Sequence, residues 1–310
     1  MKPFRIGSRG SPLALWQANW VCDRLRELAP ERGAEIEVIK TSGDKFLEGP
    51  LSRIGGKGLF VKEIEDALLE ERVDLAVHSL KDVPADLPAG LLLAAYPARE
   101  DPRDVLVVRR GAPASIEGLG RGARVGTTSL RRRSQILARR DDLEIVPLRG
   151  NVGTRLDKVD RGEVDATLLA FAGLKRLGLA ERASHVLAVD EMIPAVGQGV
   201  LAIETRVDDT STRAVVERLD VEQSRIVVAA ERAFLHRLQA GCLVPVGGHA
   251  IVESGEVRLR GIIASPDGAT SIRRERVAAP PRAAELGREL AEEILEAGGA
   301  QILAALAEPG

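Results

Sequence analysis

Several residue types are scarce in this chain of 310 residues, and each scarcity excludes a class of protein. The two cysteines, Cys22 and Cys242, are too few for a disulfide framework and lack the spacing of a metal site. The four histidines are scattered along the chain, so no metal is expected. Aromatic residues make up only 3% of the chain, which leaves little for stacking on bases and disfavours nucleic acid as a partner.

An excess of charge of one sign is also lacking, because 44 basic residues stand against 46 acidic residues. Such a chain has no overall field that attracts polyanions, so its arginines must act by local placement. No apolar run approaches the roughly 18 residues that a membrane-spanning helix needs, and the N-terminus has no signal pattern. A cytoplasmic protein that does not bind membranes is expected.

The composition that remains is globular, 45% hydrophobic and 29% charged, with material for two or three domains. Alternating strand and helix patterns predict two α/β domains, with crossing segments near Arg99–Arg103 and Met192–Gly199. Two crossings indicate a hinged pair of domains with a cleft. After residue 220, three alternating strands near 246–252, 257–264 and 271–277 are followed by helical patterns and predict a small α+β module.

The stretch from Gly126 to Arg155 contains two turns rich in glycine, hydroxyls and arginine. In the first of these two segments, Thr128 or Ser129 is a candidate N-cap of a helix. This cap places Arg131 and Arg132 in the first helical turn. The helix dipole makes a cation there unfavourable by roughly 0.3 to 1 kcal/mol. A bound carboxylate or phosphate offsets this cost, because each charge-assisted hydrogen bond contributes about 1.5 to 3 kcal/mol. The alternative is a solvated arginine-rich turn.

The N-terminal segment repeats this arrangement of strand, glycine, arginine and hydroxyl. Ser11 as N-cap with Pro12 at the first helical position predicts a helix that runs to about Ala29. Arg9 just before it marks a second anion position. Cys22 is expected to be a packing residue on this helix. The apolar face is expected to contain Leu13, Trp16, Trp20, Leu25 and Leu28.

The next segment, from Thr41 to Phe60, is a long loop rich in glycine and cations, which is typical of a lid. A helix follows from Val61, with its acidic residues expected on the outer face. A buried strand then ends at His78–Pro84, which places Lys81 and Asp82 at its carboxyl end, where α/β sheets bind ligands. The alternative for this pair is an ordinary turn, and His78 is expected to be a structural histidine at the sheet end.

Cys242 follows a predicted helix that extends from about Val221 to Gln239 and ends at Ala240–Gly241. A cysteine in a turn just past a helix end is accessible, in contrast to one inside a helix. Most single turn cysteines have no function, so this position gains meaning only from its neighbours.

Together these motifs resemble the hydroxymethylbilane synthases, also called porphobilinogen deaminases, in collinear order over nearly the whole chain. The residues that carry the resemblance are Arg9 with Ser11, Gly55–Phe60, His78–Pro84, Ser129–Arg132, Leu148–Arg155, Gly173–Arg176 and Gly241–Cys242. Arg53 stands where the family has a lysine, which keeps the charge.

The resemblance implies a transferase of tetrapyrrole biosynthesis that joins four porphobilinogen molecules head to tail with loss of ammonia. It implies a dipyrromethane cofactor held by a thioether to Cys242, with no metal. The implied fold has two α/β domains like type II periplasmic binding proteins and a C-terminal α+β domain with a three-stranded antiparallel sheet. The implied boundaries are 1–99 with 197–218, 100–196, and 219–310. A monomer with porphobilinogen as its partner is expected.

The resemblance also implies a role for each site residue, and Asp82 is expected to be the catalytic group. The residues expected to bind the cofactor are Cys242, Lys81, Asp82, Thr127, Ser129, Arg131, Arg132, Arg149, Gly150 and Arg155. Those expected to bind substrate are Arg9, Ser11, Arg149, Arg155, Arg176 and Gln198. Those expected on the lid are Lys45, Arg53, Lys57 and Phe60.

Two rival functions remain at the level of sequence. A non-catalytic, two-lobed binding protein for a small polycarboxylate fits the α/β core, but it lacks the expected export signal and gives no role to the third domain or Cys242. A metabolite-sensing regulator is disfavoured because no DNA-binding module is visible. An intact mass of the purified protein separates these classes.

Overall fold

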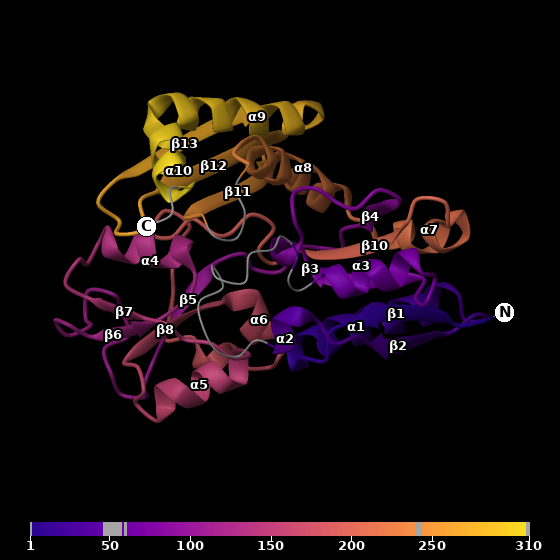
Figure 1. Cartoon of the computed structure of the whole chain (residues 1–310), viewed down its shortest axis with the longest axis horizontal. Coiled ribbons are helices and arrows are strands. Elements are labelled where there is room, and N and C mark those ends of the chain that lie inside the picture. The colour runs from indigo at the N-terminus through magenta and orange to yellow at the C-terminus, as the bar shows by residue number, and fades with distance from the viewer. Residues whose placement is uncertain (1, 46–57, 59–60, 240–243, 308–310) are drawn as a thin grey trace. The chain divides into compact units, whose positions relative to one another are not determined.

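The structure is a computed structural model that describes residues 2–45, 58, 61–239 and 244–307 (Figure 1). Its contacts divide the chain into two compact units. The first unit contains Met1–Glu100 and Gly199–Arg225, and the second contains Asp101–Gln198 and Ile226–Gly310. The chain therefore leaves the first unit and later returns to it.

The first unit is built on a five-stranded sheet with the order β2-β1-β3-β10-β4. Its strands are β1 (Phe4–Ser8), β2 (Ala34–Val38), β3 (Leu75–Ser79), β4 (Leu91–Ala95) and β10 (Leu201–Arg206). Its helices are α1 (Pro12–Leu28), α2 (Ser42–Lys45), α3 (Lys62–Leu69), α7 (Thr210–Val216) and the 3₁₀ turns η2 (Leu80–Asp82) and η4 (Glu217–Leu219). Strands β1, β2 and β3 run parallel, whereas β10 is antiparallel to both of its neighbours. Helices α1 and α7 cover one face and α3 covers the other.

Helix α1 begins as the sequence predicts, because the Ser11 side chain accepts a hydrogen bond from the Ala14 N–H and Pro12 occupies the first turn. Its expected apolar face is wrong in part. Trp16 is 37% exposed, and the next residue, Gln17, is buried instead. The buried set of this helix is Gln17, Ala18, Val21, Cys22 and Leu25. Cys22 is therefore a packing residue, as expected.

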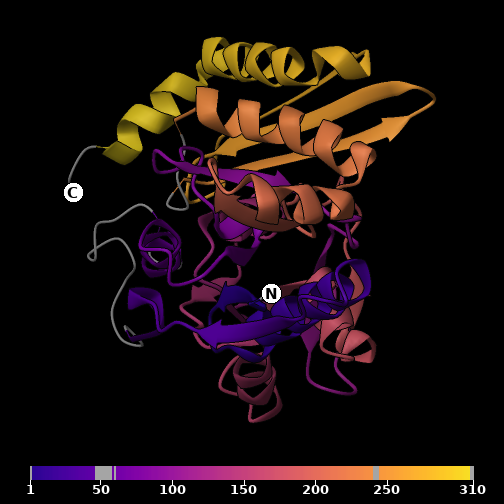
Figure 2. The ribbon, with the colours of Figure 1, turned by 90° about the vertical axis from the view of Figure 1, so that its right-hand side faces the viewer.

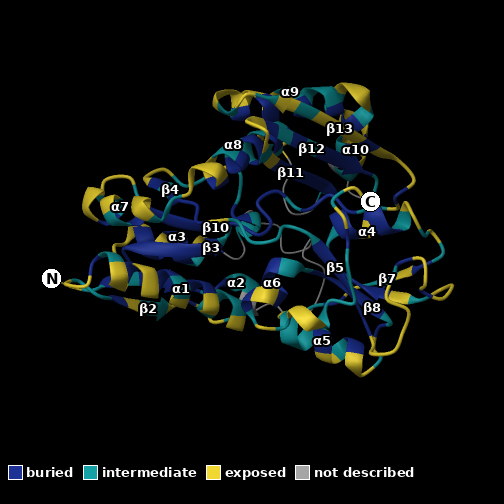
Figure 3. Cartoon of the chain, turned by 180° about the vertical axis from the view of Figure 1, so that it is seen from behind, coloured by how far each residue is buried: buried dark blue, intermediate teal, exposed yellow. Residues whose placement is uncertain are grey.

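The second unit contains another five-stranded sheet, with the order β7-β6-β8-β5-β9. Its strands are β5 (Asp104–Val108), β6 (Arg124–Gly126), β7 (Glu144–Val146), β8 (Ala166–Ala170) and β9 (His185–Val186). Its helices are α4 (Leu130–Leu137), α5 (Val152–Asp160), α6 (Phe171–Arg176) and the 3₁₀ turn η3 (Ala180–Arg182). Helix α4 packs on one face through Ile136, and α5 and α6 pack on the other through Leu156 and Leu174. Figure 3 shows β5 and β8 largely buried, whereas the edge strand β7 is more exposed.

The second unit also contains a three-stranded antiparallel sheet, which joins β11 (Val246–Glu253), β12 (Glu256–Ala264) and β13 (Ser271–Ala278). Its helices are α8 (Glu222–Arg237), which belongs to this unit from Ile226 onward, α9 (Ala283–Ile294), α10 (Ala300–Ala307), the 3₁₀ turn η5 (Pro280–Arg282) and the π-helical segment η6 (Leu295–Gly299). Figure 2 shows α8 and α9 beside this sheet. Phe234 of α8 is fully buried in their common core, with Leu290 and Ile294 of α9.

The expected fold class is confirmed: two mixed five-stranded α/β sheets and a three-stranded antiparallel module. The division into three domains stays a prediction, because the contacts group the last two domains together. Within the described residues, no helix combines the length and the apolar character that a membrane span requires.

Candidate functional site

A pocket in the first unit lies where α1 begins and β3 ends. It brings together Arg9, Ser11 and Asp82, which the sequence places in separate motifs. Lys81 is partly buried in the same 3₁₀ turn as Asp82, but it is not part of the pocket wall. The residues that line the pocket are Arg9, Ser11, Leu13, Ala14, Gln17, Val61, Ile64, Val77, His78, Ser79 and Asp82. A carboxylate, a cation and a hydroxyl therefore line the same pocket.

Gln17 is a pocket residue that the sequence analysis missed. Its Nε2 donates a hydrogen bond to Ser79 Oγ at 2.9 Å, which joins α1 to the end of β3. This bond explains why a polar residue is buried on α1, because a buried amide is costly unless it is hydrogen-bonded. The partners are 62 residues apart in the sequence, so no local signal announces them.

His78 is buried and paired, as the sequence analysis expected. Its Nε2 lies 2.9 Å from Oε2 of Glu204, a residue of β10 that has no exposed surface. Glu65 of α3 lies near both and is only 6% exposed, so the prediction that the acidic residues of this helix face outward is wrong for Glu65. Burial, with repulsion from Glu204, raises the pKa of Glu65 to about 7. His78, which lines the pocket, therefore belongs to a buried cluster of ionisable residues with Glu65 and Glu204.

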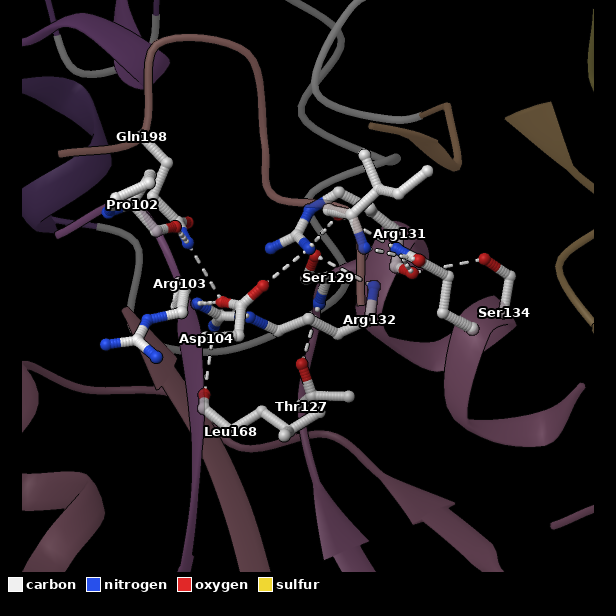
Figure 4. Close-up of polar contacts among 12 residues, drawn as sticks. Pro102, Arg103, Asp104, Thr127, Ser129, Arg131, Arg132, Ser134, Leu168 and Gln198 are labelled. Atoms are coloured by element: carbon white, nitrogen blue, oxygen red, sulfur yellow. Dashed lines mark hydrogen bonds and ion pairs between the residues drawn. The ribbon is translucent and has the colours of Figure 1, made fainter. Parts of the chain in front are cut away.

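Asp104, Arg131 and Arg132 form a buried ion triad in the second unit (Figure 4). Arg131 Nη1 lies 2.6 Å from Asp104 Oδ2, and Arg132 Nη2 lies 2.7 Å from Oδ1. Asp104 has no exposed surface, and the two arginines are 5% and 6% exposed. Arg132 Nε also donates to Asp104 Oδ1, at 3.0 Å. Each arginine donates in addition to a backbone carbonyl, Arg131 to Ile193 and Arg132 to Leu168.

The charges of this triad shift one another. Burial raises the pKa of the Asp104 carboxyl, but the two guanidinium groups outweigh burial and hold it well below its usual value. Burial, opposed by Asp104 and reinforced by Arg132, lowers the pKa of Arg131. The sequence predicts that a ligand supplies the anion that balances the two arginines at the start of α4. In the structure, the Asp104 carboxylate supplies such an anion. Two cations against one carboxylate leave an excess of one positive charge within the triad.

The backbone around the triad is fixed by the predicted cap. Ser129 Oγ accepts a hydrogen bond from the Arg132 N–H, which makes Ser129 the N-cap of α4. Buried Thr127 accepts from the Ser129 N–H at 3.2 Å, so it shapes the turn that precedes the helix. Gln198 Nε2 donates to Asp104 Oδ1 at 3.1 Å, which places this expected substrate residue beside the triad (Figure 4).

Arg149, Gly150 and Arg155 lie before and within α5, where Arg155 Nε donates to the Gly150 carbonyl at 2.8 Å. Gly150 has φ 117°, and a Cβ there would meet Thr154 Cγ2 at 2.7 Å, so the turn needs glycine. Arg176 is the last residue of α6 and is buried. These residues belong to the same unit as the triad.

Of the other expected site residues, the structure describes only Lys45. Cys242, Arg53, Lys57 and Phe60 lie outside the described residues, and Lys45 is the last residue of the short helix α2. The roles given to all site residues stay predictions, the lid included.

Two family models match this chain. Residues 4–214 match "Porphobilinogen deaminase, dipyromethane cofactor binding domain", and residues 226–296 match "Porphobilinogen deaminase, C-terminal domain". These matches define a transferase of tetrapyrrole synthesis with a cofactor-binding domain, not a non-catalytic binding protein. The chain is also 48% identical over 305 residues to the porphobilinogen deaminase of Brevibacillus brevis, which covers 98% of this chain and 97% of that protein. The chain belongs to the porphobilinogen deaminase family.

Solved structures with similar folds are much more distant in sequence. The VFT2 domain of Bordetella pertussis BvgS is 16% identical, with a TM-score of 0.41 over 70% of this chain and 85% of that chain. A periplasmic solute-binding protein of Desulfovibrio salexigens is 11% identical, with a TM-score of 0.43 over 71% of this chain and 72% of that chain.

Proposed function

We infer that the chain joins four porphobilinogen molecules head to tail, releases ammonia at each step and yields linear hydroxymethylbilane. The observation that carries this inference is the relation to a porphobilinogen deaminase over 98% of the chain. The direct test is incubation of the purified protein with porphobilinogen, with ammonia and hydroxymethylbilane measured together. Binding of porphobilinogen without ammonia release would instead favour a polycarboxylate-binding protein.

Asp82 is the group that we assign to the chemistry. Positive charge develops on the substrate pyrrole when ammonia leaves, and a fixed carboxylate stabilises charge where it develops. Asp82 can accept the pyrrole N–H and then take the proton that the free α-carbon of the preceding ring loses after it attacks the methylene carbon of the substrate. Its place in the pocket with Arg9 and Ser11 supports this role, because the acetate and propionate of porphobilinogen need a cation and a hydrogen-bond donor nearby.

Arg131 and Arg132 are the residues that we assign to the carboxylates of the dipyrromethane cofactor. When bound, the cofactor supplies the pyrrole end to which the first porphobilinogen is joined. The excess positive charge of the triad supports this assignment, since a second carboxylate balances it. We assign Arg149, Arg155 and Arg176 to the carboxylates of the growing chain. Lys81, Thr127, Ser129, Gly150 and Gln198 complete the proposed cofactor and substrate contacts.

Cys242 is the residue to which we assign cofactor attachment. It falls in the sequence between α8 and β11, whereas Cys22 is buried within α1 and has no access to a ligand. Denaturing mass spectrometry of freshly purified active protein is expected to give a mass above that of the polypeptide. The matched control is Cys22→Ser, which is expected to keep the added mass, whereas Cys242→Ser is expected to lose it. A bare polypeptide mass for active protein contradicts the assignment.

We further propose a cytoplasmic monomer that binds neither nucleic acid nor membrane, with domain boundaries at 1–99 with 197–218, 100–196 and 219–310. The near balance of 44 basic and 46 acidic residues supports the absence of nucleic-acid binding, because the chain has no overall field that attracts a polyanion. Size-exclusion chromatography with light scattering tests the monomer, and a mass of two chains would contradict it.

A further inference from the structure

The turn between β12 and β13 lies against the C-terminal end of α4, the helix whose first turn carries Arg131 and Arg132. Gly268 in this turn has φ 76°, and a Cβ built on it would lie 2.5 Å from both Ala138 N and Ser134 O. Both atoms belong to the backbone, so no side-chain rotation relieves the contact. If residue 268 carries a side chain, the turn or the helix must move.

The turn itself has little freedom to move. Ser265 N donates to the Thr270 carbonyl at 2.8 Å, and Gly268 N donates to the Ser265 carbonyl at 2.9 Å. The Asp267 carboxylate also accepts a hydrogen bond from Ala269 N at 3.1 Å. These bonds join residues of the turn to one another, so they hold its internal shape against local distortion. A side chain at residue 268 therefore pushes the turn and α4 apart, and part of that displacement falls on α4.

A shift of α4 reaches the arginines because the helix is short and rigid. It has eight residues, which span about 12 Å at the usual rise per residue. The N-terminal end of α4 is held by ion pairs, because Arg131 and Arg132 meet Asp104 at 2.6 and 2.7 Å. A helix pushed at its last turn therefore moves the two guanidinium groups off this geometry.

A second contact supports α4 from the same antiparallel sheet. Gln135 exchanges two hydrogen bonds with the backbone of Ile193, and Arg131 donates to the same Ile193 carbonyl. The next residue, Pro194, accepts a hydrogen bond from Gly248 N of β11 at 3.0 Å. The segment that holds Arg131 is thus itself held by β11.

We propose that the Ser265–Thr270 turn, through Gly268, is a positioning element that sets where α4 presents Arg131 and Arg132. The C-terminal module would thereby help to build the carboxylate-binding geometry, beyond any role in attachment. This inference rests on the proposed function of the two arginines. Binding geometry of this kind must be held within roughly half an ångström.

The matched test compares Gly268→Ala with Gly255→Ala. Gly255, in the turn between β11 and β12, has φ 80°, and a Cβ there meets nothing within 4 Å. Both substitutions place an alanine in left-handed backbone conformation, so they are expected to cost similar conformational free energy. Only the G268A side chain contacts α4. We expect G268A to show at least about a fivefold higher KM for porphobilinogen, or a correspondingly lower fraction with the cofactor mass, than G255A at similar stability. Equal KM and cofactor fraction in the two variants would overturn the proposal.

Three further variants keep the test decisive. Asn tolerates left-handed backbone better than Ala, so G268N and G255N form a second pair if G268A does not fold. A G268N protein that matches G255N also overturns the proposal. Arg131→Lys distinguishes the carboxylate-binding role of Arg131 from the positioning role of the turn. Normal cofactor loading and KM in R131K contradict the carboxylate-binding role. Impaired R131K with G268A equal to G255A contradicts only the positioning role.

Discussion

Asp104 Oδ1 accepts hydrogen bonds from both Nε and Nη2 of Arg132, at 3.0 and 2.7 Å, so the carboxylate oxygen lies in the fork of the guanidinium group. Its other oxygen faces Arg131 at 2.6 Å. One side chain at the start of β5 thus fixes two cations on α4. Charge-assisted contacts of this kind are the strong ones, and they define direction as well as distance.

Asp104→Asn is expected to destabilise the protein strongly, because it leaves two buried guanidinium groups without their carboxylate. Removing one partner of a buried ion pair costs about 3 to 5 kcal/mol. Urea denaturation measures the free energy of unfolding. The control is Asp142→Asn, whose carboxylate pairs with Arg140 near the surface and whose replacement is expected to cost much less, because solvent screens such a pair.

The difference between wild type and D104N is expected to depend on pH. The folded-state pKa of Asp104 lies below its unfolded value, so its stabilising effect is complete above the unfolded pKa of about 3.9 and is lost as pH falls through the folded value. Losses of equal size in D104N and D142N near neutral pH contradict a special role for Asp104.

Asp82→Asn is expected to give a folded protein that carries its cofactor and turns over at least about a hundredfold slower. Asn keeps the shape of the side chain but removes the charge that stabilises the developing cation. Asp82→Glu keeps the charge, displaces it, and is expected to retain more activity. Hydroxymethylbilane formation is the measurement, and near-normal turnover by D82N would place the catalytic charge elsewhere.

Arg149→Lys is expected to impair cofactor assembly or elongation while the fold survives, because lysine keeps the charge but loses the bidentate fork. Cofactor content by intact mass and turnover are the measurements. Arg110→Lys, at an exposed position in the same unit, is the matched control and is expected to behave as wild type. Wild-type values for R149K count against its role.

Glu65→Gln is expected to stabilise the protein at pH 8 and to have little effect near pH 4. Burial raises the folded-state pKa of Glu65 to about 7 from an ordinary value of 4.5, so the folded state favours the protonated form. The cost of ionising it appears as pH rises from 4.5 through 7 and reaches at most about 3 kcal/mol. Glutamine stays neutral and avoids this cost.

Thermal or urea unfolding across this pH range measures the effect. The matched control is Glu181→Gln, an exposed glutamate whose replacement is expected to give the same small change at every pH. A pH-independent difference between wild type and E65Q would show that Glu65 does not titrate in this range.

Local signals predicted much of the fold. Ser11 with Pro12, and Ser129 before an apolar pattern, announce helix starts because caps act within three residues. Gln17 and Glu65 escaped prediction, since their burial depends on β3 and β10, far away in the sequence.

The candidate site was predictable only in part. The arginines of α4 were identified because cations at a helix start break a local rule. Asp104, which resolves that conflict, is a single acidic residue at the start of a strand, and nothing around it signals the pairing. Asp104 reaches α4 only through the sheet: β5 pairs antiparallel with β8, and β8 also pairs with β6, the strand that precedes α4.

The position of β10 inside its sheet has a consequence for synthesis on the ribosome. This strand fills the place between β3 and β4, yet it is made more than a hundred residues after β4 begins. Until residue 206 has emerged, β3 and β4 each lack a neighbour and present open edges to other chains. The sheet of residues 104–186 is complete earlier. The nascent protein is therefore expected to need protection of its first hundred residues until translation passes β10.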